Sequence, residues 1–352
     1  MVRAIESKAA PALSVAVADE HGLRWADAAG QADLERAVAA TPAHLFPLGS
    51  VSKLLTATVA AKLTTRGVID LDGPIARWMP GLPVQHRQTT LRQLLTHRGG
   101  IRHYDRAETD MGSAGGAVYM RFYASEQDAL KLFIGDPLVA TPGAEVRYSS
   151  YGYTLASAVM AAAAQAPFLD LVAREVAVPF GLASLKPNDP WAITPGRAGR
   201  YMNDMDVKLL CASLAESAKP QLTDGWAKLP FDNPAYCWAG AGFLMTPSDA
   251  ARFGAAMMGS AETAVTRAER ELLLTPVTAA TKGAPPLGLG WRIDADKKGR
   301  RRWHHAGATP GGCYLLAAYP DQRLSVALAG NVMTMKMNVL QTASDLVDGF
   351  AG

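Results

Sequence analysis

The chain has 352 residues, of which 49% are hydrophobic and 19% charged, and its formal net charge is +3. This length and balance are typical of a globular protein with one large domain or two smaller ones. The small net charge argues against an extended basic surface for nucleic acid. The one basic run, at 297–302, is interpreted as a solvated turn between two strands, so we expect no nucleic-acid partner.

The cysteines and the N-terminal sequence bear on cofactors and compartment. Cys211, Cys237 and Cys313 lack metal-ligand spacing, so we expect buried free thiols and no metal site. Residues 1–20 contain no continuous apolar segment behind a basic start, which predicts no signal peptide. We therefore expect a cytoplasmic protein, or a periplasmic one if a leader before residue 1 has been removed. No apolar run approaches the length of a membrane span.

The first expected elements are a β-hairpin and a helix. Strand-like segments at 12–18 and 23–29 flank a turn and predict the hairpin. Apolar residues at helical spacing after Ser50 predict a buried helix, with Gly67 at its C-terminal end. Further helical patterns lie at 91–96, 126–135, 151–178 and 247–258.

Ser248 is a plausible N-cap for the segment 247–258, whereas 183–206 looks irregular. The end of the chain changes to strands, at 291–294, 301–305, 312–319 and 324–331, before a last helix at 337–350.

The order of these elements predicts the fold class. Strands at both ends with helices between them indicate an α+β fold, an α/β sandwich in which helices flank an antiparallel sheet made from both termini. Residues 1–75 and 240–352 would form this part, and 76–239 would form a mainly helical insertion. We expect the active site between the two.

Ser50 and Lys53 form a Ser-x-x-Lys box at the start of the helix expected after Ser50. Residues three apart lie on one helical face, so the hydroxyl and the amine can meet. A lysine can serve as the base that activates a serine when burial favours its neutral form. The box alone is weak evidence, because 16 serines and 12 lysines in this chain give about 0.5 such spacings by chance.

Two further segments can complete a site around this box. Tyr148 stands on a predicted loop, where a phenol can pass a proton between a serine and a leaving group. His305, Ala306 and Gly307 follow one another at the end of a predicted strand. Small residues there let a substrate approach the backbone, and an exposed edge N–H can stabilise an oxyanion.

As a set, these boxes resemble those of the serine β-lactamase and penicillin-binding-protein family, in its class C and esterase branch (peptidase S12 type). That family carries Ser-x-x-Lys, then Tyr-x-Asn or Tyr-x-Ser, then Lys/His-Thr/Ser-Gly, in this order. Segments 70–75, 90–101 and 239–249 also match its pattern, so the resemblance covers nearly the whole chain. Segments 101–104 and 148–155 look most like its mitochondrial β-lactamase-like members and their bacterial relatives.

The resemblance implies a β-lactamase/DD-peptidase-like fold and roles for the matched positions. Ser50 would be the nucleophile, Lys53 and Tyr148 would manage its proton, and the backbone N–H groups of Ser50 and Ala308 would form the oxyanion hole. No metal or organic cofactor is needed. The substrate-binding positions would be Ser150, His305, Ala306, Gly307 and Tyr104.

The departures from β-lactamases bear on the substrate. Ser150 replaces the asparagine of the second box, and His305 and Ala306 replace the lysine and threonine of the third. Loss of the lysine charge weakens selection for a carboxylate-bearing substrate. We expect a serine hydrolase that acts on small esters through an acyl-enzyme. A D-amino-acid peptidase or amidase, a weak β-lactamase, and a non-catalytic scaffold with a vestigial site stay open as alternatives, and no oligomeric state is predicted.

Overall fold

The computed structural model describes residues 1–123, 125–259, 264–278 and 285–351. Its main feature is a seven-stranded antiparallel sheet in the order β3-β2-β1-β12-β11-β10-β9. The strands are β1 (Ala12–Asp19), β2 (Gly22–Asp33), β3 (Val38–Ala39), β9 (Arg292–Ala295), β10 (Arg301–Thr309), β11 (Gly312–Tyr319) and β12 (Leu324–Gly330).

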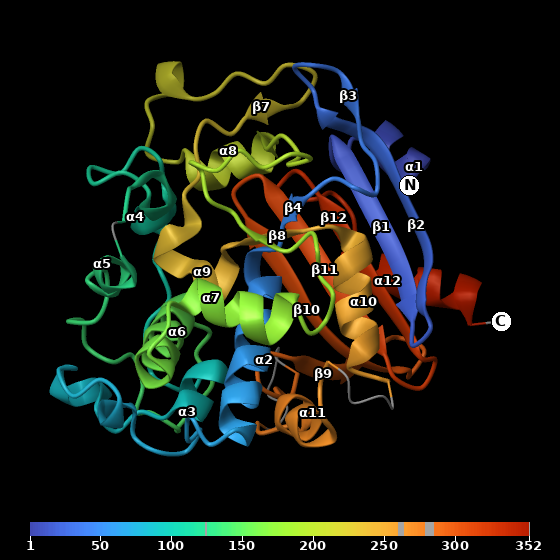
Figure 1. Cartoon of the computed structure of the whole chain (residues 1–352). Coiled ribbons are helices and arrows are strands. Elements are labelled where there is room, and N and C mark those ends of the chain that lie inside the picture. The colour runs from blue at the N-terminus through green and yellow to red at the C-terminus, as the bar shows by residue number, and fades with distance from the viewer. Residues whose placement is uncertain (124, 260–263, 279–284, 352) are drawn as a thin grey trace.

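The sheet joins the two ends of the chain, as Figure 1 shows by the blue and red strands that lie side by side. β1 and β2 form the expected hairpin, and β1 pairs with β12 along its length, from Leu13 opposite Gly330 to Ala18 opposite Ser325. The predicted fold class is therefore confirmed: an antiparallel sheet drawn from both termini, with helices on its faces.

The central strands β1, β12 and β11 are buried on both faces, and residue size alternates along them. In β1, Ala12, Ala16 and Ala18 face the larger core, whereas Leu13, Val15 and Val17 face a second, smaller core. Successive strand residues point to opposite faces, so the small residues let the helices of the larger core approach closely. The C-terminal helix α12 (Val339–Phe350) covers the second core.

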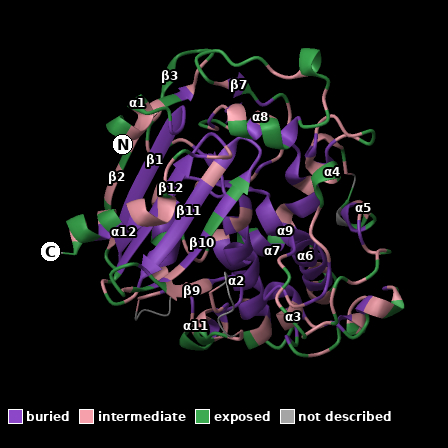
Figure 2. Cartoon of the chain, turned by 180° about the vertical axis from the view of Figure 1, so that it is seen from behind, coloured by how far each residue is buried: buried purple, intermediate pink, exposed green. Residues whose placement is uncertain are grey.

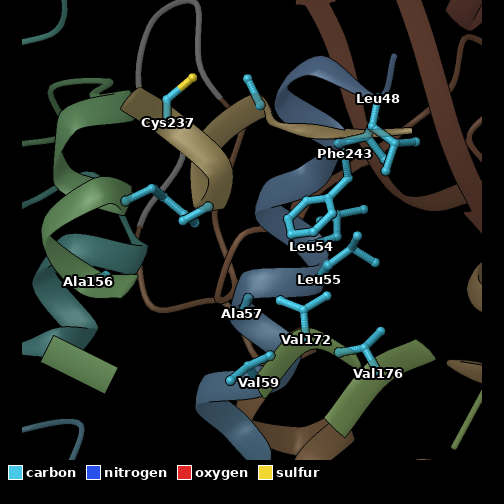
Figure 3. Close-up of a cluster of buried hydrophobic side chains, with 14 of the residues drawn as sticks. Leu48, Leu54, Leu55, Ala57, Val59, Ala156, Val172, Val176, Cys237 and Phe243 are labelled. Carbon is cyan, nitrogen blue, oxygen red and sulfur yellow. The ribbon is translucent and has the colours of Figure 1, made fainter. Parts of the chain in front are cut away.

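Helix α2 (Ser52–Thr65) lies at the centre of the larger core and is buried on nearly every side (Figure 2). Its Leu54, Leu55 and Val59 pack among residues such as Val172 and Phe243 from other elements (Figure 3). Gly67 follows its end in the left-handed region, as expected. A helix enclosed in this way holds the residues at its N-terminus rigidly.

The remaining helices lie mostly beside the sheet, on the side of α2 (Figure 1). They are α1 (Val2–Glu6), α3 (Leu91–Leu95), α4 (Arg106–Thr109), α5 (Glu126–Leu130), α6 (Ser150–Ala164), α7 (Phe168–Val172), α8 (Asp204–Leu210), α9 (Trp238–Ala241), α10 (Pro247–Ala256) and α11 (Arg267–Leu274). Short strands β4 (Phe46–Pro47), β8 (Phe243–Met245) and β5 (Lys186–Pro187) form a small sheet, and β6 (Tyr201–Met202) pairs with β7 (Ala227–Lys228).

Several predicted boundaries were wrong. The helical pattern at 151–178 is interrupted after α6, because Gln165 adopts a left-handed conformation and Pro167 follows. The helix expected at 126–135 ends at Leu130. The N-cap of α10 is Thr246, whose hydroxyl accepts the Asp249 N–H, and Ser248 lies inside the first turn. β10 continues to Thr309, so the box at His305 lies within the strand.

The basic run at 297–302 lies at the turn between β9 and β10, and carboxylates match its charges. Arg300 pairs with Asp296, Arg302 with Asp294, and Arg301 with Asp321. The turn residues 297–299 are exposed, as expected, whereas Arg302 lies within β10 and is buried. Cys211 and Cys237 are buried free thiols, whereas Cys313 is only partly buried.

Within the described residues, no single helix has the length and apolar character to cross a membrane. Ser150–Ala164 and Phe168–Ala177 pass such a test only when taken together, across a bend of 83°. The division of the chain at 75/76 and 239/240 stays a prediction.

Candidate active site

Ser50 lies in a single 3₁₀ turn, Gly49–Val51, that leads directly into α2. Its hydroxyl is within hydrogen-bond distance of two other predicted catalytic groups. Ser50 Oγ lies 2.6 Å from Tyr148 Oη and accepts a hydrogen bond of 3.1 Å from Lys53 Nζ. The structure therefore brings together Ser50, Lys53 and Tyr148, although Tyr148 is 98 residues away in the sequence.

Lys53 is the second residue of α2 and is fully buried. Besides Ser50 Oγ, its amine donates to Ser150 Oγ at 3.0 Å and to the Gly240 carbonyl at 2.8 Å. The rings of Tyr148 and Tyr153 lie 4.9 and 5.3 Å from Nζ. Three acceptors thus fix the position of the amine beside Ser50 Oγ.

Tyr148 stands just before α6, and the start of that helix fixes its neighbours. Ser149 is the N-cap, with its hydroxyl accepting the Gly152 N–H at 2.9 Å, and Ser150 is the first helical residue. Burial opposes ionisation of Tyr148, but the nearby charge of Lys53 and the hydrogen bond with Ser50 outweigh it and lower the pKa of the phenol below 10. A lowered pKa favours a phenolate that can accept a proton.

The third box lies on β10, whose pairing with β9 ends at His304. The turn that carries Ser50 packs against the strand beyond this point. Two glycines permit the contact: a side chain on Gly307 would overlap the Leu48 carbonyl, and one on Gly49, at φ +50°, would lie 2.8 Å from Ala308 N. This close approach places the backbone of Ser50 beside that of Ala308.

His305 is buried within the strand and is neutral. Its Nδ1–H donates to the Ala306 carbonyl at 2.6 Å. Burial, with the charges of Lys53 and Arg292, holds the pKa of His305 well below 6.5. The third box therefore offers no cation to a substrate, and Ala306 offers no hydroxyl.

A cavity of about 330 Å³ opens beside Ala308 and Thr309. Its wall is largely aromatic and aliphatic, and Tyr104, a predicted substrate-binding residue, is among the lining residues. Among the described residues that line it, Asp105 is the one carboxylate, and Asp105 already accepts the Glu108 N–H at 2.9 Å. The other lining residues are His103, Arg106, Thr109, Tyr119, Leu209, Leu210, Tyr236, Pro310 and Met333.

Sequence reasoning missed three residues of this site. Gly240 supplies a carbonyl to Lys53; its glycine-rich segment was noted in the sequence, but only the three-dimensional contact assigns the carbonyl. His97 and His103 each accept a backbone N–H next to Tyr148. Both histidines lie in segments that match the family pattern, and this match was the one feature of the sequence that could have pointed to them.

In the part of the chain that the structure describes, no group of three or more His, Cys, Asp or Glu side chains is arranged to hold a metal ion.

Comparison with known proteins identifies the family of the chain and several relatives. A family model described as Beta-lactamase matches residues 1–347. The serine beta-lactamase-like protein LACTB, mitochondrial, of Homo sapiens is 24% identical over 326 residues, which cover 75% of this chain and 56% of that protein. The chain thus spans little more than half the length of this relative. Esterase EstB of Burkholderia gladioli is 29% identical over 184 residues, 48% of this chain and 45% of that protein.

Among solved structures, the D-amino acid amidase of Ochrobactrum anthropi SV3 superposes with a TM-score of 0.81 at 20% identity, covering 98% of this chain and 94% of that one. At this identity the similarity concerns the fold alone.

Proposed function

The chain belongs to the beta-lactamase family, and we propose that it is a serine hydrolase that cleaves small, uncharged esters through an acyl-enzyme. The observation that carries the proposal is the contact of Ser50 Oγ with both Tyr148 Oη, at 2.6 Å, and Lys53 Nζ, at 3.1 Å. A nucleophile, a proton acceptor and a fixed amine within hydrogen-bond distance are the parts that serine acyl transfer needs.

In the proposed mechanism, Ser50 Oγ attacks the ester carbonyl and its proton passes to Tyr148 Oη. The lowered pKa of Tyr148 supports this direction of transfer. The backbone N–H groups of Ser50 and Ala308 stabilise the tetrahedral oxyanion. Tyr148 then gives the proton to the departing alcohol, and water releases the acyl group by the reverse sequence.

The surroundings of the site favour an uncharged acyl group. The neutral His305 and the methyl group of Ala306 replace the cation and hydroxyl that hold a substrate carboxylate in β-lactamases. An apolar cavity of about 150 Å³ already accommodates benzene, so the 330 Å³ beside Ala308 has room for a short acyl chain or a phenyl ring. The similarity to Esterase EstB is in keeping with this substrate class.

A D-amino-acid amidase is less well supported by the site. Such a substrate presents an ammonium group near the scissile bond, which calls for an available carboxylate. The cavity offers a single carboxylate among the described lining residues, Asp105, which is exposed and whose Oδ1 also caps α4. The fold similarity to the amidase therefore adds no support for that activity here.

A hydrolysis panel tests the proposal. Purified protein would be assayed with p-nitrophenyl acetate, butyrate and hexanoate, with D-phenylalanine p-nitroanilide and with nitrocefin. We expect kcat/KM to be at least about 100-fold higher for the best ester than for the other two classes. A preference for the anilide or for nitrocefin would overturn the ester assignment. Turnover of none of them would support the scaffold alternative.

A further inference from the structure

The segment that carries Tyr148 is docked onto residues 97–103 by four hydrogen bonds. Two involve backbone carbonyls: the Arg147 N–H donates to His97 O at 2.7 Å, and Ser149 Oγ donates to Arg102 O at 2.7 Å. The other two end on imidazole nitrogens. The position of Tyr148 therefore depends on a segment about fifty residues earlier in the chain.

The two imidazoles accept consecutive backbone N–H groups. Ser149 N donates to His97 Nδ1 at 3.2 Å, and Ser150 N donates to His103 Nδ1 at 3.1 Å. An imidazole nitrogen can accept only when it carries no proton, so both rings must be neutral with the proton on Nε2. The rings also enclose the phenol: their centroids lie 4.3 Å (His97) and 5.3 Å (His103) from that of Tyr148.

We propose that His97 and His103 are positioning residues, which hold Tyr148 against Ser50 only while their imidazoles are neutral. The inference rests on the proposed function, because it assigns Tyr148 a role in proton transfer. Protonation of either Nδ1 replaces an acceptor with a second donor facing the backbone N–H. That hydrogen bond is then lost, and the start of α6 is free to move away from the nucleophile.

Burial, helped by nearby positive charges, keeps the two rings neutral. Burial is the largest influence, and it holds the pKa of His97 well below 6.5 and lowers that of His103 to about 4. The carboxylate of Glu108 is occupied by Arg102 and by Tyr151 Oη. The groups that face His97 are Lys53, His305, Arg292, His103, Tyr148 and Tyr153, and those that face His103 are Lys53, Arg102, Tyr104 and Tyr148.

Substitutions can distinguish the proposed positioning role of these histidines from a purely space-filling one. Asparagine places its Oδ1 near the position of Nδ1, so it keeps the acceptor, loses the ring and does not titrate. Leucine approximates the volume and loses the acceptor. His103 is the better site for this pair, because His97 adopts φ +57°, a conformation that asparagine tolerates and leucine does not.

The experiment combines pH profiles with a measurement of tautomers. Steady-state hydrolysis of a p-nitrophenyl ester would be followed from about pH 2.5 to pH 8, a range that reaches below the pKa of His103, for wild type, His103→Asn, His103→Leu and the double variant His97→Asn/His103→Asn. We expect His103→Leu to lower kcat by about tenfold or more with KM nearly unchanged, and His103→Asn to restore most of kcat. In the double variant the acid-side loss of kcat should move to lower pH by about one unit.

Equal losses in the Leu and Asn variants, or an acid limb unchanged in the double variant, would overturn the proposal. ¹⁵N spectra of histidine-labelled wild type give a readout that needs no substrate. They should show His97 and His103 as neutral Nε2–H tautomers at pH 6, and Nδ1–H or protonated rings would refute the inference even in an active enzyme. If wild type turns over no ester while the tautomers are as expected, the proposed function fails and the positioning geometry stands.

Discussion

At the scale of single residues, the site depends on how completely Lys53 is enclosed. The amine is fully buried and meets three oxygen acceptors, from Ser50, Ser150 and Gly240. A buried cation or amine with this many fixed partners tolerates little change in shape. The same enclosure makes the position a sharp test of the proton-transfer scheme.

We predict that Lys53→Arg is nearly inactive, with kcat reduced by about 10³-fold or more. The planar guanidinium is larger than the space around Nζ, and it cannot reproduce the three hydrogen bonds that the amine donates. Lys62→Arg, in the last turn of the same helix, is the matched control and should keep its activity, because it preserves the charge that pairs with Glu269 and lies away from Ser50. Ester hydrolysis near the wild-type rate in Lys53→Arg would contradict the assigned role.

The third box allows a test of specificity. His305→Lys restores a cation beside the site, and Ala306→Thr adds the hydroxyl that would share a substrate carboxylate. A charge-assisted hydrogen bond contributes roughly 1.5–3 kcal/mol when well formed, so the ratio of kcat/KM for nitrocefin to that for p-nitrophenyl butyrate should rise by about tenfold or more in the double variant. A smaller gain is expected for His305→Lys alone, because its new charge lies near Lys53.

If neither variant shifts this ratio toward nitrocefin, the specificity role of the box is wrong. If His305→Ala abolishes turnover of every substrate, His305 belongs to the catalytic machinery.

At the scale of elements, the site is formed where the Gly49–Val51 turn meets β10. A side chain on Gly307 would overlap the Leu48 carbonyl and lie 2.8 Å from Ser50 N. Gly307→Ala should therefore push the turn away from the strand and separate the two proposed oxyanion donors. We predict a loss of about 10²-fold or more in kcat with little change in KM.

Gly81→Ala is a suitable control, since an added Cβ there meets nothing within 4 Å. Thermal unfolding of both variants separates a local shift of the turn from a general loss of stability. Wild-type kcat in Gly307→Ala would show that this backbone contact does not set the rate.

The elements also show what sequence can predict. Ser50 and Lys53 are three residues apart, so helical spacing alone brought them together. The sheet followed from strand patterns at both ends of the chain. The acceptor at Gly240, 187 residues from Lys53, and the imidazole acceptors beside Tyr148 depend on tertiary packing, to which no local pattern points. Two residues near the start of α10 can act as its N-cap. Thr246, followed by Pro247, takes this position in the structure, and Ser248 does not.

At the scale of the whole molecule, burial of neutral histidines links folding to pH. The pKa of His103 is lowered to about 4 in the folded protein, against about 6.5 in an unfolded chain. Below pH 6.5 the unfolded state therefore takes up this proton first, and the free energy of unfolding falls until the folded imidazole also titrates.

We predict that the loss of stability between pH 7 and pH 4.5 is smaller in His103→Asn than in wild type by roughly 2–3 kcal/mol. Urea unfolding at the two pH values measures this difference, and each protein serves as its own reference at pH 7. An identical loss in both proteins would mean that His103 is not held neutral by the fold.

The central claim is that Ser50 is an activated nucleophile, and a covalent label tests it most directly. A fluorophosphonate probe forms a stable adduct on such a serine whether or not deacylation is fast, so mass spectrometry of proteolytic peptides can locate it. We predict one adduct on Ser50 in the folded protein, none after denaturation, and none in Ser50→Ala, whose kcat should fall by a factor on the order of 10⁶ while the fold is retained. A folded wild-type protein that stays unlabelled at Ser50, or a Ser50→Ala variant that still hydrolyses esters, would contradict this account.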